Sequence, residues 1–413
     1  MIKPSKKSNR KQPLSKIRGA RSYSLFGSTL DLPTTKVLSF TPAKRSVYIK
    51  SLLSALAEEI KHNRLSLKTN IFFDEEMADY RKLLRSAPDK YLYVEDGKKR
   101  RWVLGKGAPG DTHMYWSSRQ MWKMKTKQGS LETQIIEQSP ALVRKIDGIF
   151  DINNKTKAGF RTKEMAIQCL LSFLQFDKSS SSAFPPFHAR YLAHKYLPKL
   201  GDCIVFDPCA GWGGRLLGTL LVNRKDKVTY YGTDPAVENQ EAYYGLTGRV
   251  THWLKREVAG PREAEVFAKP FEDFIKTKRA QSLFGKVDFA ITSPPYFSAE
   301  NYNPTDKKQS ANRYSEYEDW RNKFYKPLIQ GVFDLLKPGG HFALNVADVA
   351  EAPTLEKDAK NIAKEVGFHW ASFYKLAMPI SPAQRKAGTA RHVVQVDGKL
   401  FKHEPVFLFK KPQ

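Results

Sequence analysis

The sequence has few cysteines and no long apolar run, and these two shortages exclude several classes of protein. Its three cysteines, Cys169, Cys203 and Cys209, lack the pairing of a zinc finger and the number of a disulfide scaffold. No apolar run approaches the roughly 20 residues of a membrane span. The N-terminal segment also lacks the apolar stretch of a secretory signal. We therefore expect a soluble, cytoplasmic protein that uses no metal.

Acidic residues are also scarce. Asp and Glu number 42 against 69 Lys and Arg, which gives a formal net charge of +27. Such an excess predicts a polyanionic partner, most simply nucleic acid, with an anionic membrane surface as the second option. The hydrophobic share of 41% and the aromatic share of 12% are those of a core-forming protein. The 413 residues are enough for roughly two to three domains.

The N-terminal part of the chain carries a dense basic segment. Residues 1–26 contain Lys and Arg but no acid, which predicts a disordered arm that either solubilises the chain or contacts phosphates. Residues 27–165 are expected to form a nucleic-acid-binding region of mixed α and β structure. Apolar residues at helical spacing predict a helix over 43–62 within it.

A hairpin is expected over residues 90–107, around the Asp96-Gly97 pair. Lys and Arg alternate there with Tyr and Trp, and the alternation continues through 114–128. Basic side chains can hold phosphates while aromatic rings stack on bases. Burial of Trp102 in a small core is an equally good interpretation.

Apolar β-type runs alternate with helical segments in the C-terminal part of the chain, from residue 166 to 413. The runs occupy 203–206, 228–232, 287–292 and 341–346. This alternation predicts an α/β domain with a parallel sheet and crossover helices. Ligands bind such sheets at the carboxyl ends of the strands, so the loops after these runs are expected to hold the site.

The loop after the first run, Asp207 to Arg215, is rich in glycine. Gly211 and Gly213 allow a tight turn and a close approach of backbone to a ligand. A phosphate-binding loop is the alternative, but the Gly-Lys-Ser/Thr of a nucleotide triphosphatase is missing. Cys209 lies in this loop rather than in a loop suited to a cysteine nucleophile.

Two acids follow the next strands. Asp234, after the second run, is placed either to bind ribose hydroxyls or to cap the following helix. Asp273, in Phe271 to Phe274, can bind an adenine amino group with Phe271 or Phe274 near the ring, or cap a helix.

The segment Thr292-Ser293-Pro294-Pro295-Tyr296 follows the third apolar run. Two prolines stiffen the backbone and remove two N–H donors, which leaves carbonyl acceptors in a rigid loop. Such a loop suits an exocyclic amine, because Ser293 Oγ and the Pro294 carbonyl can accept its N–H groups. Tyr296 can stack on a planar base.

These motifs together resemble the S-adenosylmethionine-dependent DNA amino-methyltransferases, over roughly residues 183–413. The Ser-Pro-Pro-Tyr sequence is similar to the cytosine-N4 version of the family's catalytic motif, whereas adenine-N6 enzymes more often begin it with Asp or Asn. The resemblance implies a Rossmann-like class I methyltransferase sheet with helices on both faces. It also implies S-adenosylmethionine as cofactor and double-stranded DNA with a flipped base as substrate.

The resemblance assigns roles to particular residues. Ser293, Pro294, Pro295 and Tyr296 would be catalytic. The cofactor would be bound by residues from four segments, namely Phe184, Pro185, Asp207, Cys209, Gly211, Gly213, Asp234, Asp273 and Phe274.

Two features depart from the family pattern. Trp212 and Arg215 occupy loop positions where many relatives have smaller or hydroxyl residues, and little chain is available within the domain for target recognition. Recognition is therefore expected to fall to 27–165, with residues 297–320 as a possible mobile lid and the basic segment 384–392. A restriction–modification enzyme, an orphan enzyme and a phage or bacterial self-protection enzyme would all fit.

Other functions stay open at this stage. An adenine-N6 DNA methyltransferase or an RNA methyltransferase would use the same residues. A protein amide methyltransferase is a further alternative, since release-factor glutamine methyltransferases use Asn-Pro-Pro-Tyr. A nucleic-acid-binding protein with an inactive methyltransferase-like domain is the non-enzymatic alternative. The sequence does not set the oligomeric state.

Overall fold

The structure is a computed structural model, and it divides the chain into two compact units. One unit comprises Met1–Ile71 with Gln128–Asp177, and the other comprises Phe72–Lys127 with Lys178–Gln413. The residues that the structure describes are 20–25, 28–33, 42–62, 80–86, 92–94, 101–104, 129–155, 184–255, 257, 259–299, 302–303, 305–379, 393–396 and 399–413.

The smaller unit contains a two-stranded antiparallel sheet and helices. Strands β1 (Ala20–Leu25) and β2 (Ser28–Pro33) pair with each other, so the expected arm over 1–26 is wrong for its last residues. Its earlier part, residues 1–19, lies outside the described residues. The helices of this unit are α1 (Pro42–Lys61), α4 (Leu131–Ile136) and α5 (Pro140–Lys155).

Helix α1 confirms the helix expected from apolar spacing. Leu52, Leu53 and Leu56 are fully buried, whereas Val47 is 70% exposed. The unit is also held by an ion pair between Arg45 of α1 and Asp147 of α5, with Nε and Oδ1 2.5 Å apart. Arg45 is buried, so the pair joins two helices that are distant in sequence.

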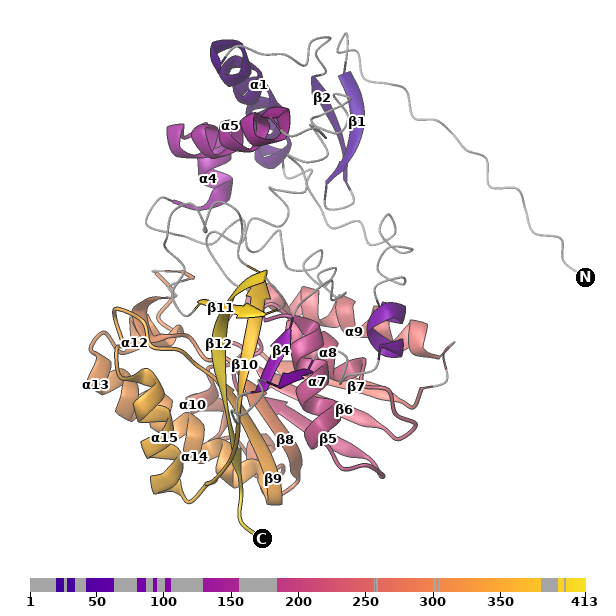
Figure 1. The fold of residues 1–413 in the computed structure, drawn as a ribbon, viewed down its shortest axis with the longest axis vertical. Helices are drawn as coiled ribbons and strands as arrows, with labels where there is room; N and C mark the ends of the chain where they lie inside the picture. Colours follow the sequence, from indigo (N-terminus) through magenta and orange to yellow (C-terminus); the bar gives the residue numbers. More distant parts are fainter. Residues whose placement is uncertain are drawn as a thin grey trace, which may run out of the picture. The chain divides into compact units, whose positions relative to one another are not determined.

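A ten-stranded sheet forms the centre of the larger unit. Its strand order is β3-β4-β10-β12-β9-β8-β5-β6-β7, with β11 paired to β12 (Figure 1). The parallel strands are β5 (Cys203–Asp207), β6 (Val228–Thr233), β7 (Arg262–Phe267), β8 (Val287–Thr292) and β9 (Leu336–Asn345). The remaining strands are β3 (Leu92–Val94), β4 (Arg101–Leu104), β10 (His369–Pro379), β11 (Val393–Val396) and β12 (Lys399–Lys410).

Helices cover both faces of this sheet. Successive residues of a strand point to opposite faces, and neighbouring residues of β5 pack against different helices. Val205 packs in a cluster with residues of α7 (Pro186–Tyr196), α8 (Gly214–Leu220) and α9 (Gln240–Leu254). The next residue, Phe206, packs in a second cluster with residues of α10 (Phe271–Phe274), α14 (Lys326–Leu335) and α15 (Leu355–Val366). The expected Rossmann-like α/β fold is confirmed.

Short elements connect the larger ones. They are η3 (Val237–Asn239), α11 (Lys278–Gln281), η4 (Phe297–Ala299), α12 (Ser310–Arg313), α13 (Tyr317–Trp320) and the π-helical turn η5 (Arg321–Tyr325).

The hairpin expected around 90–107 forms, but it belongs to another part of the fold than the one predicted. Strands β3 and β4 are antiparallel, as expected, but β4 also runs parallel to β10 at the edge of the large sheet. The segment therefore belongs to the larger unit and not to a separate region spanning 27–165. The aromatic segment 114–128 and the basic segment 384–392 lie outside the described residues.

No helix in the part of the chain that the structure describes is both long enough and apolar enough to cross a membrane.

Candidate active site

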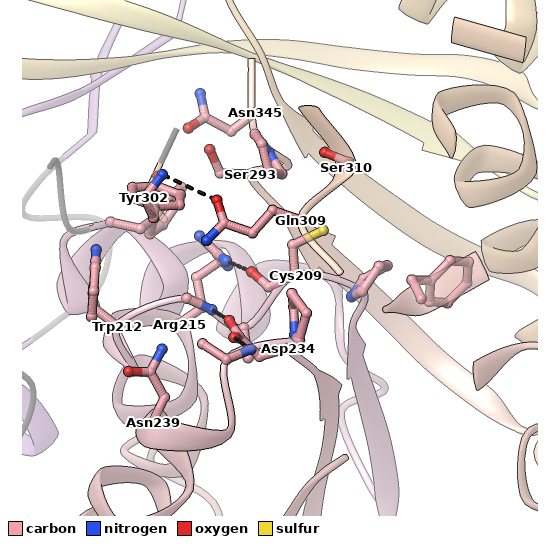
Figure 2. Close-up of a pocket in the computed structure, with 18 of the residues that line it drawn as sticks. Cys209, Trp212, Arg215, Asp234, Asn239, Ser293, Tyr302, Gln309, Ser310 and Asn345 are labelled. Carbon is pink, nitrogen blue, oxygen red and sulfur yellow. Dashed lines mark hydrogen bonds between the residues drawn. The ribbon is translucent and has the colours of Figure 1, made fainter. Parts of the chain in front are cut away.

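A pocket lies at the carboxyl ends of the parallel strands, where the sequence places it. Residues that follow four of these strands line it together with the last residue of β9, namely Gly211, Asp234, Glu272, Ser293 and Asn345. Figure 2 labels Asp234, Ser293 and Asn345 among them. The strand order reverses at β5, whose neighbours are β6 and β8. Ligand sites in open α/β sheets occur at such reversal points, because the connecting loops leave in opposite directions and open a crevice.

The glycine-rich loop begins at the end of β5 and leads into α8. Gly211 and Gly213 have φ angles of +60° and +85°, in the left-handed region that costs other residues roughly 1–2 kcal/mol. Gly213 is the N-cap of α8. These conformations turn the chain at the pocket wall, which confirms the expected tight turn.

Asp207 lies beneath this loop and is fully buried. Its carboxylate accepts hydrogen bonds from Arg215 Nε at 2.7 Å, Tyr230 Oη at 2.8 Å and Thr292 Oγ1 at 2.9 Å. The backbone N–H of Cys209 donates to it as well, at 3.1 Å. Asp207 does not line the pocket, so the structure gives it the role of joining the ends of β5, β6 and β8 rather than of touching a ligand.

Asp234 lines the pocket at the end of β6. Its Oδ2 accepts the Gly211 N–H at 2.9 Å and its Oδ1 accepts the Ala236 N–H at 2.8 Å. Burial raises the pKa of Asp234 to about 6, against the lowering effect of these two backbone hydrogen bonds. The carboxylate thus positions the glycine loop and still presents acceptor lone pairs to the pocket.

The acid after β7 that reaches the pocket is Glu272 and not the expected Asp273. Glu272 is 4% exposed, and its Oε2 has no hydrogen-bond partner. Burial raises the pKa of Glu272. Asp273 forms a two-pronged ion pair with Arg313, at 2.9 and 3.0 Å. Arg313 Nη1 also donates to Glu272 Oε1, at 3.1 Å.

Phe274, one of the two rings expected near an adenine, belongs to a hydrophobic core cluster and does not line the pocket. It stacks on Phe267 and Phe206, with ring centroids 4.5 and 5.7 Å apart. Phe271, the other of these two rings, lines the pocket. One turn of helix presents only some of its side chains to the sheet edge, and the sequence pattern does not reveal which.

Ser293 and Pro295 line the same pocket as Gly211 and Asp234. Pro294 and Tyr296 are buried and do not line it. Tyr296 is 8% exposed and packs in the core cluster that contains α14, with its hydroxyl 3.5 Å from Glu404 Oε2. The predicted stacking of Tyr296 on a base is therefore not what this arrangement shows.

The residue after this loop has an unusual backbone conformation. Phe297 has a φ of +54°, in the left-handed region of backbone conformation, which is strongly unfavourable for a bulky residue. This strained residue comes directly after Tyr296 and begins η4, and strain of this kind concentrates at functional sites.

Phe184 and Pro185 line the pocket beside the glycine loop, as expected. Pro185 is the N-cap of α7, and the Arg215 guanidinium lies over the Phe184 ring, 5.2 Å from its centroid. Helix α7 approaches α8 closely at Gly218, where a Cβ atom would come within 2.1 Å of the Pro186 carbonyl oxygen.

Cys209 lines the pocket as well. Burial and the neighbouring Asp207 raise the pKa of its thiol. A thiol that holds its proton is a weak nucleophile. The environment of Cys209 is therefore better suited to a residue that lines the pocket than to a covalent catalyst.

The segment after Phe297, expected as a lid, contributes Tyr302, Lys308 and Gln309 to the pocket. Gln309 Oε1 accepts the N–H groups of Tyr302 and Asn303, at 3.1 and 3.2 Å. Tyr302 also meets the Trp212 ring edge-on, 6.0 Å between centroids. The loop residue that departs from the family pattern thus contacts this segment.

Asn345 and Glu404 are pocket residues that the sequence did not reveal. Asn345 ends β9, next to β8, and lies beside Ser293 in Figure 2. Glu404 belongs to β12, to which the sequence analysis gave no role in the site. A polar residue at the end of an apolar strand was the available signal for Asn345, whereas Glu404 lies within β12 and offered no such signal.

No protein-family model matches the sequence, and no curated protein matches it either. Solved structures similar to the chain include a SAM-dependent methyltransferase from Methanosarcina mazei, with 16% identity, a TM-score of 0.32 and coverage of 54% of this chain and 97% of that one. A SAM-dependent O-methyltransferase from Thermotoga maritima matches with 14% identity, a TM-score of 0.31 and coverage of 57% and 69%.

Proposed function

We propose that this protein is an S-adenosylmethionine-dependent methyltransferase that modifies the exocyclic amine of a base in DNA, namely cytosine N4. The observation that carries this proposal is that Ser293 and Pro295 share one pocket with Gly211 and Asp234. An amine-binding loop and a loop suited to a nucleoside cofactor thus meet at the reversal point of the sheet.

The pocket residues fit S-adenosylmethionine. The glycine turn offers close backbone approach, and Asp234 offers two carboxylate oxygens to ribose hydroxyls. Glu272 has a buried oxygen without a partner, and an orphaned acceptor is costly unless a ligand donates to it. An adenine amino group is such a donor, so Glu272 takes the role first expected of Asp273.

The bound cofactor would supply an electrophilic methyl group on a sulfonium sulfur. The protein itself orients the acceptor amine. The N–H groups of this amine donate to Ser293 Oγ and to the rigid backbone next to it. A base within a duplex cannot reach this pocket, so it must leave the stack. Catalysis then comes mainly from positioning.

The charge of +27 supports a polymeric, anionic substrate over a small amine or a protein amide. Serine at the first position of the motif favours cytosine over adenine, on the family resemblance. Adenine-N6 methylation is the nearest alternative, because its amine needs the same acceptors.

Mass spectrometry of nucleosides tests the proposal directly. DNA from cells that express the protein is expected to contain N4-methylcytosine, and DNA from cells that express Ser293→Ala is expected to contain far less. N6-methyladenine instead would change the target base. Methylated RNA with unmodified DNA would change the polymer, and no methylated nucleoside despite measurable cofactor binding would contradict the proposal.

A further inference from the structure

A carboxylate lies on the side of the pocket where the acceptor would bind. Glu404 lines the pocket together with Ser293 and Asn345, which come from the ends of β8 and β9. Strand β12 pairs antiparallel with β9, with Val406 opposite Asn345. Glu404 therefore lies just beyond the carboxyl end of β9, at a point where β12 still pairs with β10.

The backbone around Glu404 is held from both neighbouring strands. Asn345 Nδ2 donates to the Pro405 carbonyl at 2.9 Å, and Glu404 itself is in register with Leu376 of β10. Both Asn345 and Pro405 are buried. The carboxyl group is thus presented to the pocket by a rigid sheet and not by a loop, which is the condition for precise positioning.

The hydroxyl of Tyr296 links Glu404 to the amine-binding loop, at 3.5 Å from Oε2. Tyr296 is buried in the core, so its hydroxyl has a fixed location. The Ser-Pro-Pro-Tyr loop and the β12 carboxylate therefore meet at one point. This contact gives the tyrosine a place in the site without any stacking on a base.

We propose that Glu404 is a catalytic residue that accepts the proton released by the acceptor amine. This inference rests on the proposed methyl transfer. The acceptor nitrogen gives its lone pair to the methyl carbon, and the carbon–sulfur bond breaks with its electron pair on sulfur. The nitrogen then sheds its positive charge by passing one N–H proton to the Glu404 carboxylate, which later releases it to water.

No other acid lines the pocket on this side among the described residues. Asp234 and Glu272 follow β6 and β7, on the far side of β5 from β8 and β9. Other titratable groups line the same pocket or adjoin Glu404, and they set the background of any pH profile. They are His188, Cys209, Arg215, Asp234, Glu272, Tyr296, Tyr302, Lys308 and His403.

Glu404→Gln tests the inference, because the amide keeps the shape of the side chain but cannot take a proton. We expect kcat to fall about 100-fold, in the range typical of general bases, with the Kd values for S-adenosylmethionine and for a cytosine-containing oligonucleotide unchanged. The acidic limb that the carboxylate contributes to the pH–kcat profile is expected to disappear. Glu404→Asp is expected to recover part of the rate and to keep that limb.

Glu238→Gln is the matched control, because Glu238 is exposed on η3 next to a pocket residue, and its rate is expected to equal that of the unaltered protein. A Glu404→Gln rate within about threefold of the unaltered protein would overturn the inference while leaving the proposed function intact. A loss of cofactor affinity in Glu404→Gln would also overturn it, since it would show a structural role. Absence of methyl transfer by the unaltered protein would instead contradict the proposed function itself.

Discussion

Asp207 and Arg215 form a buried ion pair under the glycine loop, with Oδ2 and Nε 2.7 Å apart and the two side chains 0% and 5% exposed. The pair connects the end of β5 to the first turn of α8. Arg215 Nη2 also donates to the Cys209 carbonyl. A charge network that is fully enclosed can hold the loop in one conformation, because each polar atom has a defined partner.

The first prediction follows from this pair. Asp207→Ala leaves the Arg215 guanidinium buried without its counter-charge, so the free energy of unfolding is expected to fall by about 3–5 kcal/mol. Chemical denaturation measures this loss. Asp319→Ala breaks an exposed pair with Lys323 and serves as the control, with an expected change of at most about 1 kcal/mol. Equal effects of the two substitutions would contradict the role given to Asp207.

Cofactor binding is expected to depend on pH through Asp234. Its pKa of about 6 in the free protein means that the carboxylate is protonated below that value, and a protonated carboxyl loses acceptor capacity for two ribose hydroxyls. Affinity for S-adenosylmethionine should therefore fall as the pH drops through about 6. Titration calorimetry measures this affinity between pH 5 and 8. These values bracket the pKa by roughly one unit or more.

Asp234→Asn tests whether the pH dependence comes from Asp234 or from another titratable group in the pocket. We expect weaker binding at neutral pH, by about one to two factors of ten since hydrogen bonds to a charged group contribute about 1.5–3 kcal/mol. Its affinity should be flat across the same pH range. A variant with the same pH dependence as the unaltered protein would assign the titration to another group.

Substitutions of the adjacent acids Glu272 and Asp273 are expected to change the affinity for the cofactor to different extents. Glu272→Gln alters the buried carboxyl of the pocket, so cofactor affinity is expected to fall by about tenfold, the equivalent of about 1.4 kcal/mol. Asp273→Asn weakens a half-exposed pair with Arg313, which keeps its contact with Glu272 Oε1, so affinity should change little. Equilibrium binding of S-adenosylmethionine to both variants decides between them. The reverse ranking would restore Asp273 to the role expected from the sequence.

Two helical glycines offer a matched pair. A Cβ at Gly218 of α8 would come within 2.1 Å of the Pro186 carbonyl oxygen, whereas a Cβ at Gly248 of α9 would meet nothing within 4 Å. Gly218→Ala is expected to destabilise the fold by about 1–3 kcal/mol. Gly248→Ala is expected to stabilise it by up to about 1 kcal/mol, since alanine favours helix.

Thermal denaturation of both glycine variants tests this expectation. Cofactor affinity should also fall in Gly218→Ala alone, because the clash would push α7 and the adjoining Phe184 and Pro185 away from the glycine loop. A neutral Gly218→Ala would mean that the close contact of the two helices can relax without cost.

Local pattern was sufficient to predict the core of this architecture. Each apolar run that was expected as a strand forms one, because Val, Ile, Phe and Ala in a continuous run can be buried on both faces only at the centre of a parallel sheet. The loops after those strands could then be placed at one edge, since parallel strands end together. Ser293 and Gly211, from two of these loops, line one pocket.

Tertiary packing decided which side chain of a motif faces the ligand. Asp207 turned inward to three strand ends, Glu272 replaced Asp273, and Tyr296 went into the core, because the direction of a side chain depends on what packs against its own turn. Packing also brought Asn345 and Glu404 to the site from distant positions in the chain. The spacing of residues along a chain determines which elements form, whereas the convergence of separate elements on one volume exists only after they have packed together.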